Sequence, residues 1–391
     1  MNRIDFDEHF KIQMKAMKFF RVHPNTEYNH YKTLLIATAL SLNTTYFVLL
    51  INSIINHDLK NKDYFNAIRN FVPVSYYVTL SLNYLLLFVN KKIIAKLIDY
   101  IKTDYSNMSN IDKQGRTIMY NYARKGSWIM LRILYLSLAC ILIFIMKSII
   151  VSLIYKYRDE YRYVNFHEMH YPNFIDDRKQ SDILVFIATY MGTLGYTTVN
   201  AAIFACVIPL GPITMLHACG QLELIKNKFE DLFKNDNIDE RLNEIIKDLQ
   251  NVYSFIGNIN KSFSTTYEIL LKQNTLLMSL TSYAVIESVV QGNFAVEYIS
   301  LFLSDLFTSS VLCYYGDLLM EKGEEVRLAA YQSGWEHVYN PSARKKLLII
   351  LTRGVQPTAI RSIFCIINLN TLANVYRTSY TIFNIMRAAG D

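Results

Sequence analysis

The chain has 391 residues, of which 52% are hydrophobic, 14% aromatic and 19% charged. The charged share is below the roughly 25% of soluble domains, and the formal net charge of +7 is spread over loops instead of forming one basic patch. These numbers disfavour a soluble, disordered or nucleic-acid-binding protein and favour a membrane protein.

Seven apolar segments are each long enough to cross a hydrocarbon core of about 30 Å, which requires roughly 20 helical residues. In chain order they are residues 33–56, 70–90, 127–154, 183–216, 268–290, 295–320 and 361–387. The first, second and fourth carry no charged stripe of the kind that a soluble helical bundle shows at helical spacing, whereas the last three contain charges. We therefore predict an all-α membrane protein with seven transmembrane helices.

The distribution of Lys and Arg predicts the orientation of these helices. Twenty-six of them lie in the N-terminal segment and in the second, fourth and sixth loops, against nine in the remaining loops and the C-terminus. Cytoplasmic loops carry the basic excess in membrane proteins. The N-terminus is thus expected to be cytoplasmic and the C-terminus extracellular, the reverse of a G-protein-coupled receptor.

The predicted organisation has six parts. They are a cytoplasmic N-terminus (1–32), transmembrane helices one to four (33–216), a cytoplasmic helical anchor region (217–267), helices five and six (268–320), a cytoplasmic segment with a short helix (321–360), and the last helix with the extracellular C-terminus (361–391).

Two cytoplasmic segments are expected to be helical. Residues 222–258 carry two runs of apolar side chains at helical spacing, so two amphipathic helices extend helices four and five and pack within the chain or against neighbouring subunits. Asn340 and Pro341 fit the N-cap and first residue of a short helix, which ends near Gly354. The final span then begins at Arg361.

No catalytic or metal-binding pattern is present. The chain lacks CxxC spacing, clustered histidines, Ser/His/Asp or Cys/His arrangements and Gly-rich phosphate loops, so we expect no enzyme, cofactor, metal site or disulfide framework. The five cysteines are odd in number and lie in or just beyond apolar runs: Cys140, Cys206, Cys219, Cys313 and Cys365.

Five charged residues fall inside predicted spans, where a functional role is the default hypothesis. They are Arg132, Glu287, Glu297, Asp305 and Arg377. Glu297 can be accommodated at the membrane interface, whereas Asp305 is mid-span and either pairs with Arg132 or faces water. A structural ion pair or a hydrogen-bonded polar group is the alternative to a functional role.

Four stretches of the sequence form a recognisable ordered set. They are 82–86 (LNYLL) with 96–104 (KLIDYIKTD); 217–223 (HACGQLE); Cys313 through Gly316 and 329–331 to Trp335; and 343–345 with 347–351, Pro357 and the ending 378–383 (TSYTIF). In this order, over nearly the whole chain, the set resembles the insect odorant receptor family, and most closely receptors of ants, wasps and bees.

This resemblance implies an odorant-gated, non-selective cation channel in the plasma membrane of an olfactory neuron dendrite. Four subunits would surround one pore, usually with an obligate co-receptor, and the lipid bilayer and a small volatile odorant would be the other partners. The chain lacks the large fourth-loop insertion of the co-receptor, so it is similar to a ligand-tuning subunit.

Two alternative classes remain open. A gustatory receptor of the same superfamily usually ends with Thr-Tyr, several apolar residues and Gln-Phe, whereas here Thr381 is followed by Ile-Phe-Asn. A G-protein-coupled receptor would show an Asp/Glu-Arg-Tyr motif after the third span and Asn-Pro-x-x-Tyr at the end of the seventh.

The resemblance also implies two functional sites. An odorant pocket is expected among spans two to six in the outer half of the membrane, with candidate residues Tyr76, Tyr77, Phe144, Tyr190, Met191, Tyr283 and Phe302. The last span is expected to line the pore through one helical face, formed by Thr378, Thr381, Ile385 and Ala389. Ile385 matches a hydrophobic gate position, and Arg377 is expected at a subunit seam.

Overall fold

The computed structural model describes residues 6–23, 29–158, 163–234, 237–292, 295–337 and 339–390, with the side chains at 109, 110, 234, 389 and 390 outside this description. Within these ranges most of the chain is helical, and the one β-type contact is an isolated bridge between Arg361 and Ile366. The helices are α1 (Phe6–His9), α2 (Lys11–Phe19), α3 (His30–Ser53), α4 (Tyr64–Val89), α5 (Lys91–Ser106), α6 (Lys113–Tyr157), α7 (Asn173–Lys179), α8 (Ile183–Val207), α9 (Leu210–Glu230), α10 (Ile238–Val290), α11 (Val296–Tyr331), α12 (Pro341–Gly354) and α13 (Leu369–Gly390). Short 3₁₀ turns occupy Asn107–Asn110, Leu232–Lys234 and Trp335–His337, and a π-helix, η1, occupies Ile54–Leu59.

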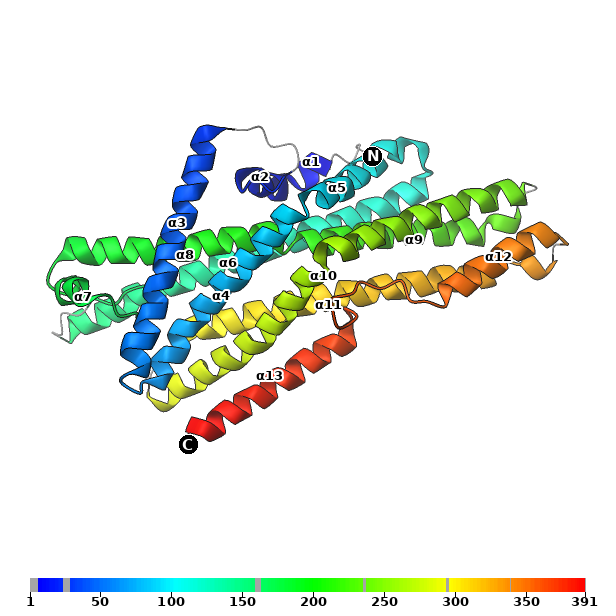
Figure 1. Ribbon diagram of the computed structural model, residues 1–391. Helices are drawn as coiled ribbons and strands as arrows, with labels where there is room; N and C mark the ends of the chain where they lie inside the picture. The colour runs from blue at the N-terminus through cyan, green and yellow to red at the C-terminus, as the bar shows by residue number, and fades with distance from the viewer. Residues whose placement is uncertain are drawn as a thin grey trace.

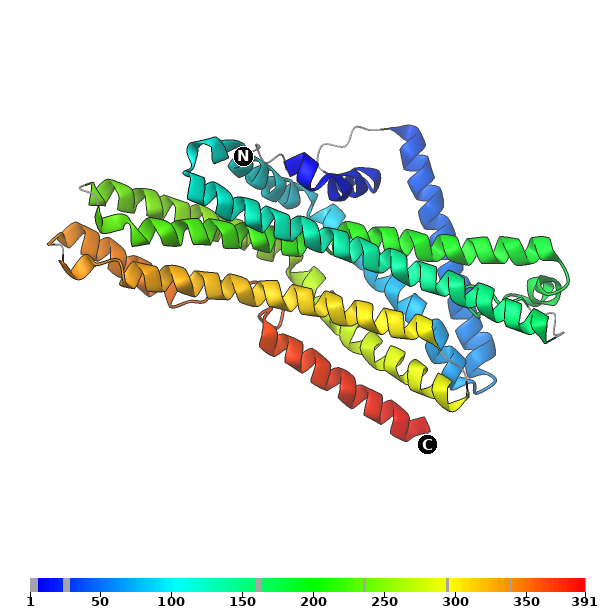
Figure 2. The same ribbon diagram turned by 180° about the vertical axis from the view of Figure 1, so that it is seen from behind.

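The helices form an elongated bundle (Figures 1 and 2). One end carries α12 and the turn between α9 and α10, and the opposite end carries α7 and the connection between α3 and α4. The short helices α1 and α2 pack on α5, α6 and α8, with Phe10, Met14 and Met17 buried. The C-terminus of α13 points toward the end where α7 lies.

Hydropathy and length identify five helical stretches in the described ranges that could cross a membrane. They are His30–Leu59, Tyr64–Val89, Lys113–Tyr157, Ile183–Glu230 and Val296–His337, and they contain the predicted spans one to four and six. The other two predicted spans are helical too, in the second half of α10 and in α13. They fall short in hydropathy because both carry several amide, hydroxyl and charged side chains.

The two amphipathic helices expected in residues 222–258 are present as continuations of neighbouring helices. α9 runs on to Glu230, and α10 continues without interruption from Ile238 through 53 residues. Their apolar stripes face each other and α11, so that Ile225, Phe229 and Leu242 are fully buried. The structure therefore supports packing within the chain. Salt bridges from Lys228 to the Glu244 and Asp248 carboxylates (2.7 and 2.8 Å) tie α9 to α10.

The fourth predicted span differs in its bounds. It is broken between α8 and α9 at Ile208–Pro209, because proline cannot continue the backbone hydrogen bonds of a helix.

The short helix α12 begins at Pro341, as predicted. The side chain of Asn340 accepts a hydrogen bond from the amide of Ala343.

The expected helical start of the last span at Arg361 is wrong, because α13 begins at Leu369. Residues 361–368 satisfy their backbone in another way: the Ser362 amide donates to the Cys365 carbonyl (2.9 Å), and the Ser362 hydroxyl accepts from the Cys365 amide (3.2 Å). Side chains of this kind compete with helix formation. The 22 residues that remain in α13 still give about 33 Å of helix, enough to cross a membrane.

The non-helical segment 361–368 lies directly against α11 at Gly316. A Cβ atom on Gly316 would meet the backbone carbonyl oxygen of Ile367, whose amide donates to the carbonyl of Ile360 (2.9 Å). A glycine is therefore required where the start of α13 crosses α11.

We expect Gly316→Ala to lower the midpoint of thermal unfolding of the detergent-solubilised protein, with a loss of about 1–3 kcal/mol from overpacking. The matched control is Gly257→Ala in α10, where an added Cβ meets no atom within 4 Å. That substitution should stabilise the helix by roughly 0.5–1 kcal/mol. Equal midpoints for the two variants would contradict the close approach at Gly316.

Candidate functional site

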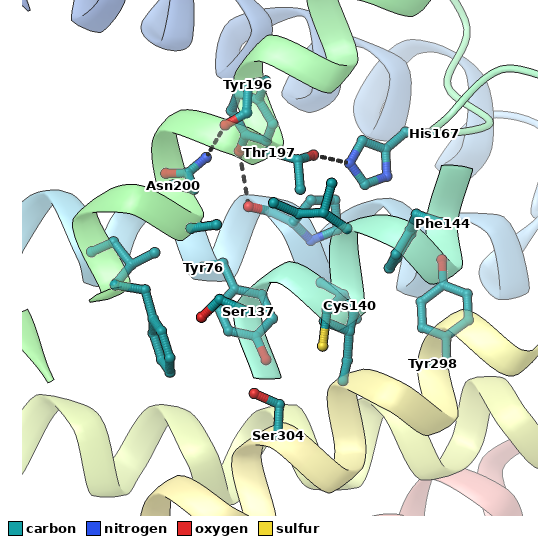
Figure 3. A pocket seen from close by; sticks show the side chains of 17 residues that line it. Tyr76, Ser137, Cys140, Phe144, His167, Tyr196, Thr197, Asn200, Tyr298 and Ser304 are labelled. Carbon is teal, nitrogen blue, oxygen red and sulfur yellow. Dashed lines mark hydrogen bonds between the residues drawn. The ribbon is translucent and has the colours of Figure 1, made fainter. Parts of the chain in front are cut away.

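A cavity of about 100 Å³ lies among α4, α6, α8 and α11 (Figure 3). Its wall is almost entirely carbon. The residues that line it are Val72, Pro73, Tyr76, Leu80, Ser137, Cys140, Ile141, Phe144, His167, Tyr196, Thr197, Asn200, Ala201, Phe204, Tyr298, Leu301 and Ser304. An apolar cavity of about 150 Å³ in another protein binds benzene; this cavity is smaller, so as it stands it suits an apolar molecule of at most about that size.

Helical periodicity explains which side chains reach the cavity. α6 contributes Ser137, Cys140 and Phe144, which are spaced three and four residues apart and so share one face of the helix. α11 contributes Tyr298, Leu301 and Ser304 at a similar spacing. Each helix thus presents one stripe to the cavity and its remaining faces to neighbouring helices or to the outside.

The helical turn at Pro73 in α4 is hydrogen-bonded to side chains of both α11 and α8. Proline has no N–H, so the carbonyl of Arg69, four residues earlier in α4, loses its helical partner. The hydroxyl of Tyr298 in α11 donates to that carbonyl (3.4 Å), and the hydroxyl of Tyr196 in α8 donates to the carbonyl of Pro73 itself (2.8 Å). The irregular turn in α4 therefore fixes two aromatic side chains of the site.

A buried hydrogen bond joins α4 to α11 beside the cavity. The Tyr76 hydroxyl donates to Asp305 Oδ1 (2.6 Å), and Asp305 is only 2% exposed. Asp305 therefore neither pairs with Arg132 nor faces water, and the alternative expectation of a hydrogen-bonded polar group is confirmed for it. Arg132 is exposed on α6, where its guanidinium lies 4.7 Å from the centre of the Trp128 ring.

His167 reaches the cavity from the segment between α6 and α7. Its Nε2 lies 3.0 Å from the Thr197 hydroxyl (Figure 3). Burial, reinforced by the charges of Lys147 and Arg69, lowers the pKa of His167 to about 3. The imidazole is therefore neutral at physiological pH, and the cavity carries no net charge from this residue.

An ion cluster covers the end of the cavity nearest α7. Lys147 Nζ lies 2.8 Å from Glu168 Oε1 and 3.3 Å from Glu297 Oε1, and the Arg69 guanidinium lies 3.5 and 3.8 Å from the same two oxygens. Two cations and two carboxylates balance each other. Glu297 is 2% exposed in the first turn of α11, and its expected place at the membrane interface stays a prediction.

A polar hollow of about 170 Å³ lies on the far side of this cluster. Glu168 borders both the hollow and a smaller space of about 10 Å³, and Phe144, His167 and Tyr298 border both that smaller space and the apolar cavity. The three spaces thus follow one another from the outside of the bundle to its interior.

The structure brings two of the seven candidate ligand residues, Tyr76 and Phe144, into the cavity wall. The other five lie elsewhere. Tyr77 stacks on Phe47 of α3 (ring centroids 4.4 Å apart), Tyr190 packs beside Phe166 and Phe186, Met191 is 59% exposed, Phe302 packs against the main core, and Tyr283 is half-buried on α10.

Several lining residues were missed by sequence reasoning. Tyr196 and Asn200 lie four residues apart on α8 and share a face, which a search for polar or aromatic residues at helical spacing could have found. His167 gave no such signal, because it lies in a segment without helical periodicity.

The candidate pore residues share one face of α13. Thr378, Thr381 and Ile385 are exposed, with Ile385 at 63%. The opposite face carries Ser379, which accepts a hydrogen bond at its carbonyl from Ser279 of α10 (2.8 Å). The side chain of Ala389 lies outside the described part of the structure, and Arg377 is exposed.

Comparison with known proteins gives a consistent family. The profile of the 7tm odorant receptor family matches residues 64–380. The putative odorant receptor 92a of Drosophila melanogaster is 24% identical over 216 residues (53% of this chain, 52% of the relative), and odorant receptor 67c of the same species is 26% identical over 189 residues (47% and 46%). The chain thus spans about half the length of the curated relatives it matches.

A solved structure shares the fold. The olfactory receptor OR5 from Machilis hrabei, determined in complex with eugenol, superposes with a TM-score of 0.77 at 15% identity, covering 98% of this chain and 100% of that one. This likeness confirms the predicted all-α fold.

We expect Tyr76→Phe to destabilise the protein, because it removes the donor to Asp305 and leaves a buried carboxyl group without that hydrogen bond, at a cost of about 1–3 kcal/mol. The midpoint of thermal unfolding in detergent measures the effect. Tyr77→Phe is the control, since that hydroxyl bonds to Thr44 at an exposed site (2.8 Å). A control that lowers the midpoint as much as Tyr76→Phe would contradict this assignment.

Proposed function

The chain belongs to the insect odorant receptor family, and on that premise we propose that it is an odorant-binding subunit of a ligand-gated cation channel. The site is the apolar cavity among α4, α6, α8 and α11. In this proposal a small volatile molecule enters the cavity, and its binding opens a pore formed by four subunits, of which one or more belong to an obligate co-receptor.

The single observation that carries the proposal is that the wall of the cavity is almost entirely carbon and that most of its few polar side chains are already hydrogen-bonded within the protein. Ser137 donates to the carbonyl of Ile133 (2.9 Å), and Asn200 donates to the carbonyl of Tyr196 (3.0 Å). A ligand with many polar groups would lose its hydration without replacement. Apolar burial, at about 25 cal/mol per Å², would supply most of the affinity.

The orientation in the membrane remains part of the proposal. The excess of Lys and Arg in the N-terminal segment and even-numbered loops favours a cytoplasmic location for α12 and for the turn between α9 and α10. The ion cluster and the polar hollow would then face the outside. The protein would be placed in the plasma membrane of an olfactory neuron dendrite.

The exposed face of α13 supports its proposed place in the pore wall. Thr378, Thr381 and Ile385 are exposed on a helix that is anchored through its opposite side. Four such faces around one axis would form a conduit, and a ring of Ile385 side chains would close it by excluding water. Arg377 would lie at the seam between subunits.

We expect Ala201→Leu to fill the cavity and lower the potency of an activating odorant at least tenfold, equivalent to about 1.4 kcal/mol of binding free energy. Phe144→Leu should instead favour larger ligands, because it removes volume from the wall. The measurement is odorant-evoked current in cells that express the chain with a co-receptor, with surface labelling to confirm folding.

Met191→Leu is the control for the cavity variants, since Met191 is exposed on α8 and does not line the cavity. Potency that changes equally in all three variants, or in none, would place the odorant elsewhere.

In the same cells, we expect Ile385→Ala to raise the basal current or alter ion selectivity, because it removes the hydrophobic constriction. Ile382→Ala, at a half-buried position on the same helix, should have a smaller effect. Normal currents in both variants and at Thr378→Ala and Thr381→Ala would exclude α13 of this chain from the pore wall.

A further inference from the structure

Two histidines far apart in sequence meet at the end of the bundle where α7 lies. His57 belongs to the π-helix η1, and His170 belongs to the segment before α7. Their rings stack with centroids 3.3 Å apart and an interplanar angle of 16°. Asp58 lies beside them, with Oδ1 3.3 Å from His57 Nδ1, and one ligand atom from each of the three residues lies within 4.8 Å of the others.

A second set of hydrogen bonds holds these side chains in place. His170 Nδ1 lies 3.0 Å from Asp176 Oδ2, which leaves Nε2 of that ring available to a ligand. Asp58 is buried, and its Oδ2 accepts from the side-chain amide of Asn70 (2.8 Å). Metal-binding histidines and carboxylates are commonly supported in this way by outer carboxylate and amide partners.

We propose that His57, Asp58 and His170 bind a transition-metal dication, for which Zn²⁺ is the best match. Imidazole nitrogens and a carboxylate oxygen are the ligand types that Zn²⁺ takes, with water in a fourth position. Zn–N and Zn–O bonds of about 2.0–2.1 Å place neighbouring ligand atoms roughly 3.3 Å apart in a tetrahedral site.

The contact between His57 Nδ1 and Asp58 Oδ1 already has the spacing of two zinc ligands. The widest separation among the three ligand atoms, up to 4.8 Å, must close, and one of the two stacked rings must turn out of parallel, because an imidazole binds a metal through a lone pair in its ring plane. The two histidines are only partly buried, so their rings have room to turn, whereas buried Asp58 is the fixed member of the site.

A bound ion would fasten η1 to the segment that precedes α7. That segment also carries His167, which lines the cavity, and Glu168 of the ion cluster. Zn²⁺ would therefore restrict the part of the chain that covers the cavity and change odorant potency. This coupling rests on the proposed function, whereas metal binding itself does not.

The test uses the purified full-length protein and Zn²⁺ alone, with Mg²⁺ as the comparison ion. Zn²⁺ should raise the midpoint of thermal unfolding of the wild type, and Mg²⁺ should not. His57→Gln and His170→Gln should abolish the response, and Asp176→Asn should require about 10–100-fold more Zn²⁺. His337→Gln, at an exposed histidine on the opposite end of the bundle, should respond like the wild type. Midpoints measured without metal confirm that each variant folds.

Two results would overturn the site: a wild type that does not respond to millimolar Zn²⁺, or a response that survives in both His57→Gln and His170→Gln. Because this assay needs no channel activity, a receptor without odorant-evoked current would leave the metal site standing. Recordings of odorant-evoked current with and without Zn²⁺ test the coupling, and an unchanged potency in the wild type would overturn that part alone.

Discussion

A lipid environment offers backbone N–H and C=O groups no water, so a helix that crosses it must satisfy its own backbone or find another partner in the protein. The irregular turns of this molecule follow from that requirement. Pro73 has no N–H to donate to the carbonyl of Arg69, and this carbonyl accepts a hydrogen bond from the hydroxyl of Tyr298 instead. At 361–368 the Ser362 side chain and an isolated bridge replace helical bonds. Both irregularities occur where a proposed functional element is positioned: the cavity in the first case and α13 in the second.

Polar side chains around the cavity meet the same requirement for a hydrogen-bond partner within the protein. Tyr76, Tyr196 and Asn200 each direct their hydrogen bonds into the protein, and the charges of the ion cluster cancel in pairs. What remains for a ligand is a carbon surface with a neutral imidazole. If the cavity is the odorant site proposed above, selectivity among ligands would depend mainly on shape, since the wall offers few directional groups.

The sequence predicted the parts of this fold that depend on long, strongly apolar runs. Seven helices, the helical extensions and the Asn340–Pro341 cap were confirmed, because each depends on local composition or on two adjacent residues. The bounds of the last helix were not, since Ser362 and Asn368 could be read as helical residues until their partners were known. The sequence also could not predict which face of a helix lines the cavity. Tyr76 lines it, and the adjacent Tyr77 does not. His57 and His170 meet only through tertiary structure, so no spacing rule could pair them.

α10 is one unbroken helix of 53 residues, about 80 Å from end to end. It contacts α4, which forms a wall of the cavity, and α13, and its first half packs on α9 and α12. The contact of α10 with α13, through the hydroxyl of Ser279 and the carbonyl of Ser379, lies on the same stretch of the rod as its packing against Val72 of α4 through Leu277 and Leu280. One rigid helix therefore carries both the wall helix α4 and the last helix, and the two are held in a fixed relation over about one helical turn.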